Sequence, residues 1–172
     1  MGRPRSFNED AVLDAAAEVF VHGGYEGTSI DDLVKALNLH RGSLYKAFGS
    51  KRGLFLAVLE RYVEAHLANA TRAAQMSADD AINVLTRSQD LDLLLYAALE
   101  RGHQDAQVAA LVRRALELIE QATADQLDPP RASDPASRPK QAIELLGSRL
   151  YERLHKDPNV LNTPHQLTTQ ET

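Results

Sequence analysis

Apolar residues recur at three- and four-residue spacing through most of this chain, and no feature constrains its fold more. In the first segment Val12, Ala16, Val19 and Phe20 fall on one helical face. No stretch alternates apolar and polar residues as a half-buried strand would, so the sequence predicts an all-α fold. We expect helices over residues 8–22, 29–37, 40–48, 50–68, 77–88, 91–101, 105–127 and 140–156.

Capping and turn residues mark the ends of the early helices. The glycine pair at 23–24 is expected to end the first helix, because glycine adopts the left-handed cap conformation without steric cost. Ser29 and Asp32 have the spacing of a capping box at the start of the second helix. Asn38 follows that helix, and asparagine tolerates positive φ better than most residues, so a tight turn is expected there.

Composition excludes several classes of protein. The 172 residues include no cysteine, so the chain has no disulfide framework, thiolate metal site or cysteine nucleophile. Apolar residues make up 44% of the chain and charged residues 25%, which is typical of a globular protein. No segment has the roughly 18–20 apolar residues that a membrane span needs, and no signal peptide is evident. We therefore expect a protein of the bacterial cytoplasm without a membrane partner.

The net charge of −5 argues against nucleic acid as a partner until its distribution is considered. Residues 1–56 contain seven basic and seven acidic side chains, so the whole net charge lies in the remainder of the chain. Residues 33–59 contain five basic side chains and no carboxylate. A solvated basic face would explain this interval, but so would a surface that approaches DNA.

Residues 28–48 predict two short helices joined by a tight turn, which is a helix-turn-helix motif. The second helix of such a motif can lie in the major groove of DNA. It must be short and polar at its N-terminal end, and residues His40, Arg41, Gly42, Ser43 and Lys46 meet that requirement. Gly42 would let the backbone approach the duplex closely, and the helix N-terminus itself favours a phosphate.

These residues resemble the DNA-binding domain of the TetR family of bacterial repressors. The resemblance covers residues 5 to about 60 and rests on the runs 28–33 and 39–51, above all on the spacing of Leu44, Tyr45, Phe48 and Lys51. It implies a three-helix DNA-binding domain followed by a helical domain that dimerises and binds a small-molecule inducer. The turn departs from the usual Ala-Gly-Val of the family, because residues 37–39 read Leu-Asn-Leu.

The resemblance also implies roles for individual residues at the DNA. The recognition-helix positions that would face DNA are Arg41, Ser43, Tyr45 and Lys46, with Tyr45 on a phosphate. Thr28 and Ser29 correspond to the start of the second helix, near the DNA backbone, and Lys51 to a lysine that contacts phosphate. Arg3 and Arg5 resemble a basic arm that can reach a minor groove.

We expect two domains. Residues 1–50 form the helix-turn-helix domain, and residues 51–156 form the ligand-binding and dimerisation domain, interrupted by a Pro-rich loop at 128–139. Residues 157–172 are polar and aperiodic and are expected to be a disordered tail. Members of the family usually end in two helices that build the dimer interface, whereas only the helix at 140–156 is evident here.

Candidate ligand-binding residues in the second domain are Tyr62, His66 and Tyr96, since the apolar helix at 91–101 would line a pocket. The alternative is that all three are ordinary core or surface residues. Metal binding is not expected, because no second ligand follows His66 or His103 by three or four residues. Glu100 and Arg101 are interpreted as an exposed ion pair rather than a catalytic dyad.

The sequence therefore predicts a transcriptional regulator, a ligand-responsive repressor that binds a palindromic DNA operator as a homodimer. The alternative is a helical interaction module whose helix-turn-helix no longer binds DNA. An enzyme with an accessory DNA-binding domain is disfavoured, because the sequence has no Gly-rich phosphate loop, nucleophile elbow or metal cluster. No cofactor is expected.

Overall fold

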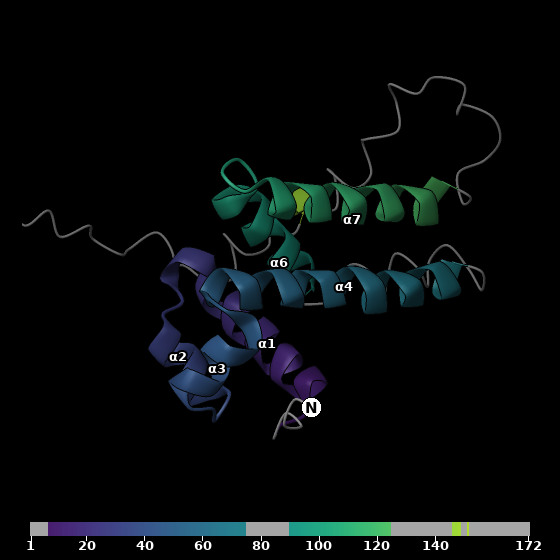
Figure 1. The fold of residues 1–172 in the computed structure, drawn as a ribbon. Helices are drawn as coiled ribbons and strands as arrows, with labels where there is room; N and C mark the ends of the chain where they lie inside the picture. The colour runs from purple at the N-terminus through teal and green to yellow at the C-terminus, as the bar shows by residue number, and fades with distance from the viewer. Residues whose placement is uncertain (1–6, 75–89, 125–145, 149–150, 152–172) are drawn as a thin grey trace, which may run out of the picture.

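Every element in the described part of the chain is helical, which confirms the predicted all-α fold. The computed structural model describes residues 7–74, 90–124, 146–148 and 151. The elements are α1 (Glu9–Gly27), α2 (Ile30–Ala36), α3 (Arg41–Phe48), α4 (Lys51–Ala74), α6 (Asp90–Tyr96), the π-helical turn η1 (Ala97–Arg101) and α7 (Ala106–Ala124). Helices α1, α2 and α3 gather at one end of the molecule, and α4 extends from them beside α7 (Figure 1).

Helix α1 begins where predicted but ends later. The Asn8 side chain accepts a hydrogen bond from the backbone N–H of Ala11 and caps the helix. At Gly24 the backbone leaves the helical conformation, with φ of 67° and ψ of 177°, yet the helix resumes and ends at Gly27. The expected end at residue 22 was therefore wrong, because the glycine pair kinks the helix instead of ending it.

Helices α2 and α3 form the expected pair. The capping box is complete: the Ser29 hydroxyl accepts from the N–H of Asp32, and the Asp32 carboxylate accepts from the N–H of Ser29. The hydrogen bonds from Ser29 to the Asp32 carboxylate lower its pKa. Leu33 of α2 and Leu44 of α3 are fully buried and join the two helices to the core.

Helix α4 connects the N-terminal domain, which we define as α1–α3, to the rest of the molecule. The Ser50 hydroxyl accepts from the N–H of Gly53 and caps α4, as expected, although α4 runs to Ala74 and not to residue 68. The Phe55 ring near its start packs edge-on against Phe20 of α1, with 4.9 Å between ring centroids. Both rings are fully buried, so the N-terminal domain and α4 share one core.

The C-terminal half packs on α4 through aliphatic side chains. Helices α4 and α7 run side by side in the same direction, and α6 packs against α1 and α4 (Figure 1). Val108, Ala115 and Ile119 recur along α7 and are fully buried. This core contains no ring from α7.

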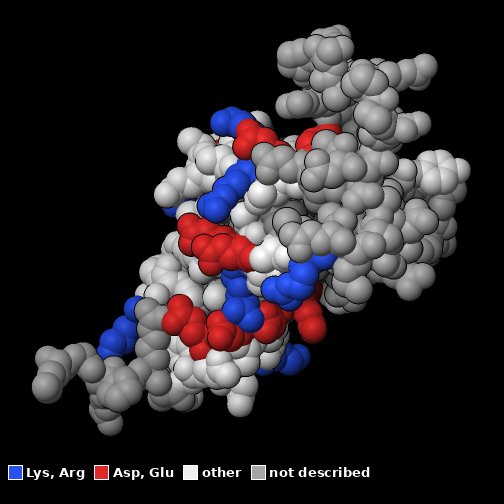
Figure 2. Space-filling view, turned by 90° about the vertical axis from the view of Figure 1, so that its right-hand side faces the viewer, with Lys and Arg blue, Asp and Glu red and all other residues white. Residues whose placement is uncertain are grey.

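Ion pairs join helices that are distant in sequence. The Arg61 guanidinium on α4 binds the carboxylates of Asp10 and Asp14 on α1, at 2.6 and 2.9 Å. Arg52 at the start of α4 makes a two-pronged contact with Asp105, at 2.5 and 2.8 Å. On the face shown in Figure 2 the described acidic and basic side chains are interleaved instead of forming areas of one sign.

Several sequence expectations fall outside the described residues. These are the helix at 77–88, the Pro-rich loop at 128–139, most of the helix at 140–156 and the tail at 157–172. Within the predicted last helix, residues 146–148 and 151 are helical, and Leu146 packs against the core.

The Asp105 carboxylate is expected to make stability depend on pH. Its side chain is only 4% exposed, and the hydrogen bonds from Arg52 lower its pKa from 3.8 to about 2. Because the folded pKa lies below the unfolded one, this carboxylate stabilises the fold above about pH 4, and the contribution is lost as pH falls toward 2.

We predict that Asp105→Asn lowers the free energy of unfolding at pH 7 by about 1–3 kcal/mol, because it removes a charged partner from Arg52. The difference from wild type should shrink between pH 4 and pH 2. Urea titrations across this range measure it, with Glu117→Gln on the exposed surface of α7 as the matched control. Equal stability of Asp105→Asn and wild type at pH 7 would contradict the prediction.

Candidate nucleic-acid interface

Helix α3 has one buried and one exposed face. Leu44 is fully buried, whereas Arg41 and Lys46 are exposed and the Tyr45 ring is 43% exposed. Helices α2 and α3 lie at the end of the molecule opposite α7 (Figure 1), so neither α7 nor α6 covers them. The face that the sequence assigns to DNA is therefore open.

The turn that positions α3 depends on Asn38. Its φ of 48° is the one positive value among the non-glycine residues that the structure describes. This conformation reverses the chain within three residues, and the N–H of Leu39 then donates to the carbonyl of Val34 at 3.2 Å. The expected left-handed residue is confirmed, and it determines the angle between α2 and α3.

The N-terminal end of α3 presents little side-chain bulk. His40 is the N-cap residue, is exposed and makes no side-chain capping bond. A Cβ atom added at Gly42 would meet nothing within 4 Å, so this glycine faces open space. Ser43 is half-buried. The geometry therefore agrees with the expectation that the backbone near Gly42 can approach another molecule closely.

Arg41 makes an intramolecular contact on this surface. Its Nη2 lies 2.6 Å from Oδ1 of Asp31 on α2, and the two side chains are 55% and 80% exposed. Ion pairs this exposed contribute little to stability. The guanidinium can therefore exchange this carboxylate for a phosphate or a base edge at little cost, and Asp31 holds it extended beside the turn.

Thr28 lies just before α2 and has an internal partner. The residue is 3% exposed, and its hydroxyl donates to the carbonyl of Gly24 at 2.6 Å. The expected position of Thr28 near the DNA backbone remains a prediction. Ser29 is exposed, but its hydroxyl donates to Asp32 and completes the capping box.

Lys51 also has internal partners. Its Nζ donates to the carbonyls of Tyr25 and Thr28, at 2.8 and 2.9 Å, and lies 4.3 Å from the centroid of the Tyr25 ring. Two of its three protons are used in this way. Lys51 therefore ties the end of α1 to the start of α4, and its contact with phosphate remains a prediction. Arg3 and Arg5 lie outside the described residues.

The structure describes two of the three candidate ligand-binding side chains. Tyr62 is 4% exposed and belongs to the main hydrophobic cluster. Tyr96 is half-buried at the end of α6, and the side chain of His66 lies outside the described residues. The environment of Tyr62 favours the alternative of an ordinary core residue.

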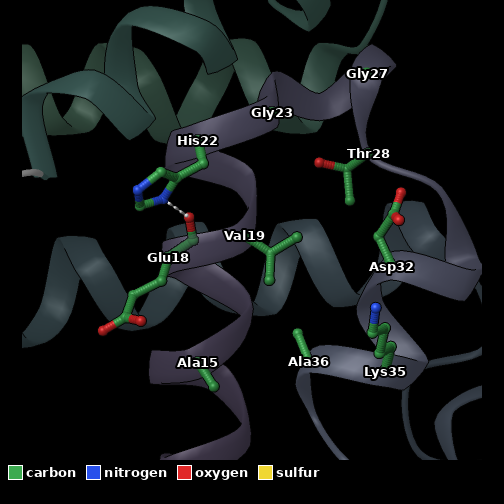
Figure 3. A pocket seen from close by; sticks show the side chains of 10 residues that line it. All are labelled: Ala15, Glu18, Val19, His22, Gly23, Gly27, Thr28, Asp32, Lys35 and Ala36. Atoms are coloured by element: carbon green, nitrogen blue, oxygen red, sulfur yellow. Dashed lines mark hydrogen bonds between the residues drawn. The ribbon is translucent and has the colours of Figure 1, made fainter.

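An open groove lies between α1 and α2 in the N-terminal domain (Figure 3). Its polar lining includes Glu18 and His22 of α1 and Asp32 and Lys35 of α2. The His22 Nδ1 donates to the carbonyl of Glu18 at 2.7 Å, and Asp32 belongs to the capping box. These groups therefore serve the caps and turns of the domain.

Neither a metal cluster nor a membrane span is found in the described residues. Within residues 7–74 and 90–124, no three His, Cys, Asp or Glu side chains are grouped as metal ligands. In the same part of the chain, no helix combines the length and apolar character needed to cross a membrane.

The contacts of Glu100 and Arg101 were not predicted from the sequence. Glu100 and Arg101 do not form the exposed ion pair expected of them. Glu100 accepts from the backbone N–H groups of Tyr25 and Glu26, and the Arg101 side chain is mostly buried beside Asp105. The double glycine at 23–24 was the available signal, since such a pair permits close approach of another group.

A short helix that follows a tight left-handed turn and exposes cationic and aromatic side chains defines a helix-turn-helix protein of the DNA-binding kind. Residues 12–58 match the family model described as bacterial regulatory proteins, tetR family. This part of the chain is therefore similar to the bacterial regulatory proteins of the tetR family, as the sequence motif predicted.

Characterised relatives match part of this chain. The transcriptional repressor ComR of Escherichia coli K12 is 49% identical over 63 residues, which are 37% of this chain and 30% of ComR. The transcriptional activator FasR of Mycolicibacterium smegmatis is 34% identical over 77 residues, 45% of this chain and 35% of FasR. The match spans about a third of the length of these relatives.

Solved structures share the fold along most of the chain. A cysteine mutant of the TetR-family regulator CifR, crystallised with 26-bp operator DNA, has a TM-score of 0.64 and 23% identity, covering 92% of this chain and 93% of CifR. A TetR regulator from Legionella pneumophila has a TM-score of 0.64 and 20% identity, covering 92% and 94%. These likenesses confirm the two-part helical architecture.

We predict that the turn tolerates glycine but not alanine at position 38. Alanine at positive φ costs roughly 1–2 kcal/mol, whereas glycine adopts this conformation freely. Thermal unfolding should therefore give a lower midpoint for Asn38→Ala and an almost unchanged one for Asn38→Gly. A midpoint for Asn38→Ala equal to that of wild type would show that the left-handed turn does not determine the position of α3.

Proposed function

We propose that this protein represses transcription by binding a palindromic DNA operator as a homodimer, and that a small molecule bound to residues 51–156 releases it. Residues 1–50 are the DNA-binding domain in this proposal. The observation that carries it is the exposed face of α3, where Arg41, Tyr45 and Lys46 lie outward around a fully buried Leu44.

The charge distribution supports DNA as the partner. Residues 33–59 contain no carboxylate and include all of α3, so the segment that would enter the major groove adds no repulsion toward phosphate. Residues 57–172 carry the net charge of −5, whereas residues 1–56 are neutral overall. The overall acidity of the protein is thus compatible with DNA binding.

Two-fold symmetry follows from the requirements of this docking. One α3 helix of eight residues contacts only a few base pairs, so specific binding calls for a second protomer. The two recognition helices would lie about 34–36 Å apart, one turn of DNA, and would read a palindrome. CifR, which has the same fold, was crystallised on double-stranded operator DNA.

Repression is proposed from the relatives of the N-terminal domain. ComR and BdcR of Escherichia coli K12, 49% and 42% identical there, are described as repressors, whereas FasR, at 34%, is described as an activator. Release by a ligand requires that the ligand bind the DNA-free conformation more tightly than the DNA-bound one. The protein would act without catalysis or a cofactor, in the bacterial cytoplasm where its operator lies.

We predict that Arg41→Ala weakens binding to the operator by roughly 5- to 150-fold, the loss expected for one specific base contact. Lys46→Ala should weaken binding to all duplexes and lower the slope of log K against log salt by about 1. Fluorescence anisotropy with a labelled duplex from the region upstream of the protein's own gene measures both.

Arg113→Ala is the matched control, because Arg113 is an exposed cation on α7, far from α3. It should bind like wild type. If wild-type protein gives no salt-dependent, sequence-specific binding to the upstream duplex, the chain is instead a helical interaction module. If Arg41→Ala binds as tightly as wild type, the assignment of α3 to the major groove is wrong.

A further inference from the structure

The kink in α1 forms a small anion-binding site. At Gly24 the backbone adopts φ of 67°, and the next two N–H groups, those of Tyr25 and Glu26, turn toward a common point. Successive backbone N–H groups that follow such a turn form a concave site for an anionic oxygen. In this structure the site is filled from within the chain.

The occupant is the side chain of Glu100 in η1. A single oxygen, Oε2, accepts from the N–H of Tyr25 at 2.6 Å and from the N–H of Glu26 at 3.0 Å. Charge-assisted bonds to a carboxylate are about twice as strong as neutral ones. These two bonds join segments that are 75 and 74 residues apart, one in the N-terminal domain and one in the C-terminal half.

Gly24 is required for this approach. A Cβ atom added at Gly24 would lie only 2.4 Å from Oε1 of Glu100, so any other residue would push the carboxylate away. The positive φ disfavours a side chain at the same position. The backbone conformation at the kink and the close approach of the Glu100 carboxylate therefore both require glycine at position 24.

The π-helical turn places Glu100 at this site. Residues Ala97–Arg101 are π-helical where they follow α6, and such turns are rare and frequently lie at functional sites. The wider turn changes the angular position of the side chains after α6 relative to a regular α-helix. Leu99, next to Glu100, is 60% exposed, so the turn is not shaped by burial of every residue in it.

Neighbouring side chains complete the contact around Tyr25. The Arg101 guanidinium lies 4.9 Å from the centroid of the Tyr25 ring, and its Nη1 is 3.5 Å from the Glu26 carboxylate. Its Nη2 is 3.7 Å from Asp105, which also binds Arg52 at the start of α4. The contact thus links η1 with α1, α4 and the start of α7.

We propose that Glu100 is a positioning residue that sets the orientation of the DNA-binding domain relative to the C-terminal half. This orientation in turn sets the affinity for DNA, a link that rests on the proposed function. Apart from the Glu100 contact and the Arg101 contacts with Glu26 and the Tyr25 ring, the N-terminal domain meets the C-terminal half through apolar packing and through α4. Apolar packing permits small rotations, whereas two hydrogen bonds to one oxygen specify a single orientation. Removal of the Glu100 carboxylate from the site allows the N-terminal domain to rotate relative to the C-terminal half.

Three substitutions separate the parts of this contact. Glu100→Gln retains a carbonyl oxygen at full reach but removes the charge. Glu100→Asp retains the charge but is shorter by one methylene, so its carboxylate cannot reach both N–H groups. Glu100→Ala removes the acceptor altogether. Glu117→Ala, on the exposed surface of α7, is the matched control, because it also removes an acidic side chain but not this contact.

The orientation can be measured without DNA. Because the chain has no cysteine, spin labels can be attached at Lys35→Cys on α2 and Ala110→Cys on α7, both exposed. Double electron–electron resonance spectroscopy then gives the distribution of distances between the labels. Excess unlabelled protein is added so that only distances within one chain are measured. We expect a single narrow distribution for the wild type, Glu100→Gln and Glu117→Ala, and at least a doubled width for Glu100→Asp and Glu100→Ala.

Operator binding by the unlabelled variants is the second measurement. Kd should rise about tenfold for Glu100→Asp and Glu100→Ala, and stay within twofold for Glu100→Gln and Glu117→Ala. Unchanged distributions in Glu100→Asp and Glu100→Ala overturn the proposal, even if their unfolding midpoints fall. Broadened distributions with an unchanged Kd overturn the link to affinity. If the wild type itself binds no DNA, the proposed function fails, and the label distances still decide the role of Glu100.

Discussion

The environment of Tyr25 is the constraint on which the rest of the structure depends. Its ring lies 4.9 Å from Phe55 of α4 and 6.3 Å from Phe20 of α1, and the cations of Lys51 and Arg101 lie over it. Its N–H donates to Glu100 and its carbonyl accepts from Lys51. Burial raises the pKa of its phenol. One residue thus joins α1, α4 and η1 at the junction of the two halves.

This junction explains why the exposed face of α3 can be polar without weakening the fold. The polar groups of the N-terminal domain that lie inward have internal partners, as Thr28 has in Gly24 and Lys51 in two carbonyls. Stability is supplied by the buried rings and aliphatic side chains, including Leu33 and Leu44. The exposed residues of α3 are therefore not needed for the stability of the fold, and selection can act on their contacts with DNA.

Local features of the sequence predicted most of the N-terminal domain. The capping box at Ser29 and Asp32 and the left-handed turn at Asn38 follow from rules that act over four or five residues, and the structure confirms both. Glu100 could not be found in this way, because its partners are 74 and 75 residues away. The internal bond of the Thr28 hydroxyl could not be found either, because it depends on a kink at Gly24 that periodicity does not reveal.

The central claim is that α3 is the surface that meets DNA. The most direct test is a titration of ¹⁵N-labelled protein with the duplex from its own upstream region, followed by the shifts of backbone amide resonances. The account predicts that the largest shifts fall on residues 40–46, with smaller ones at the start of α2. Shifts confined to the groove between α1 and α2 or to α7, with residues 40–46 unmoved, would contradict it.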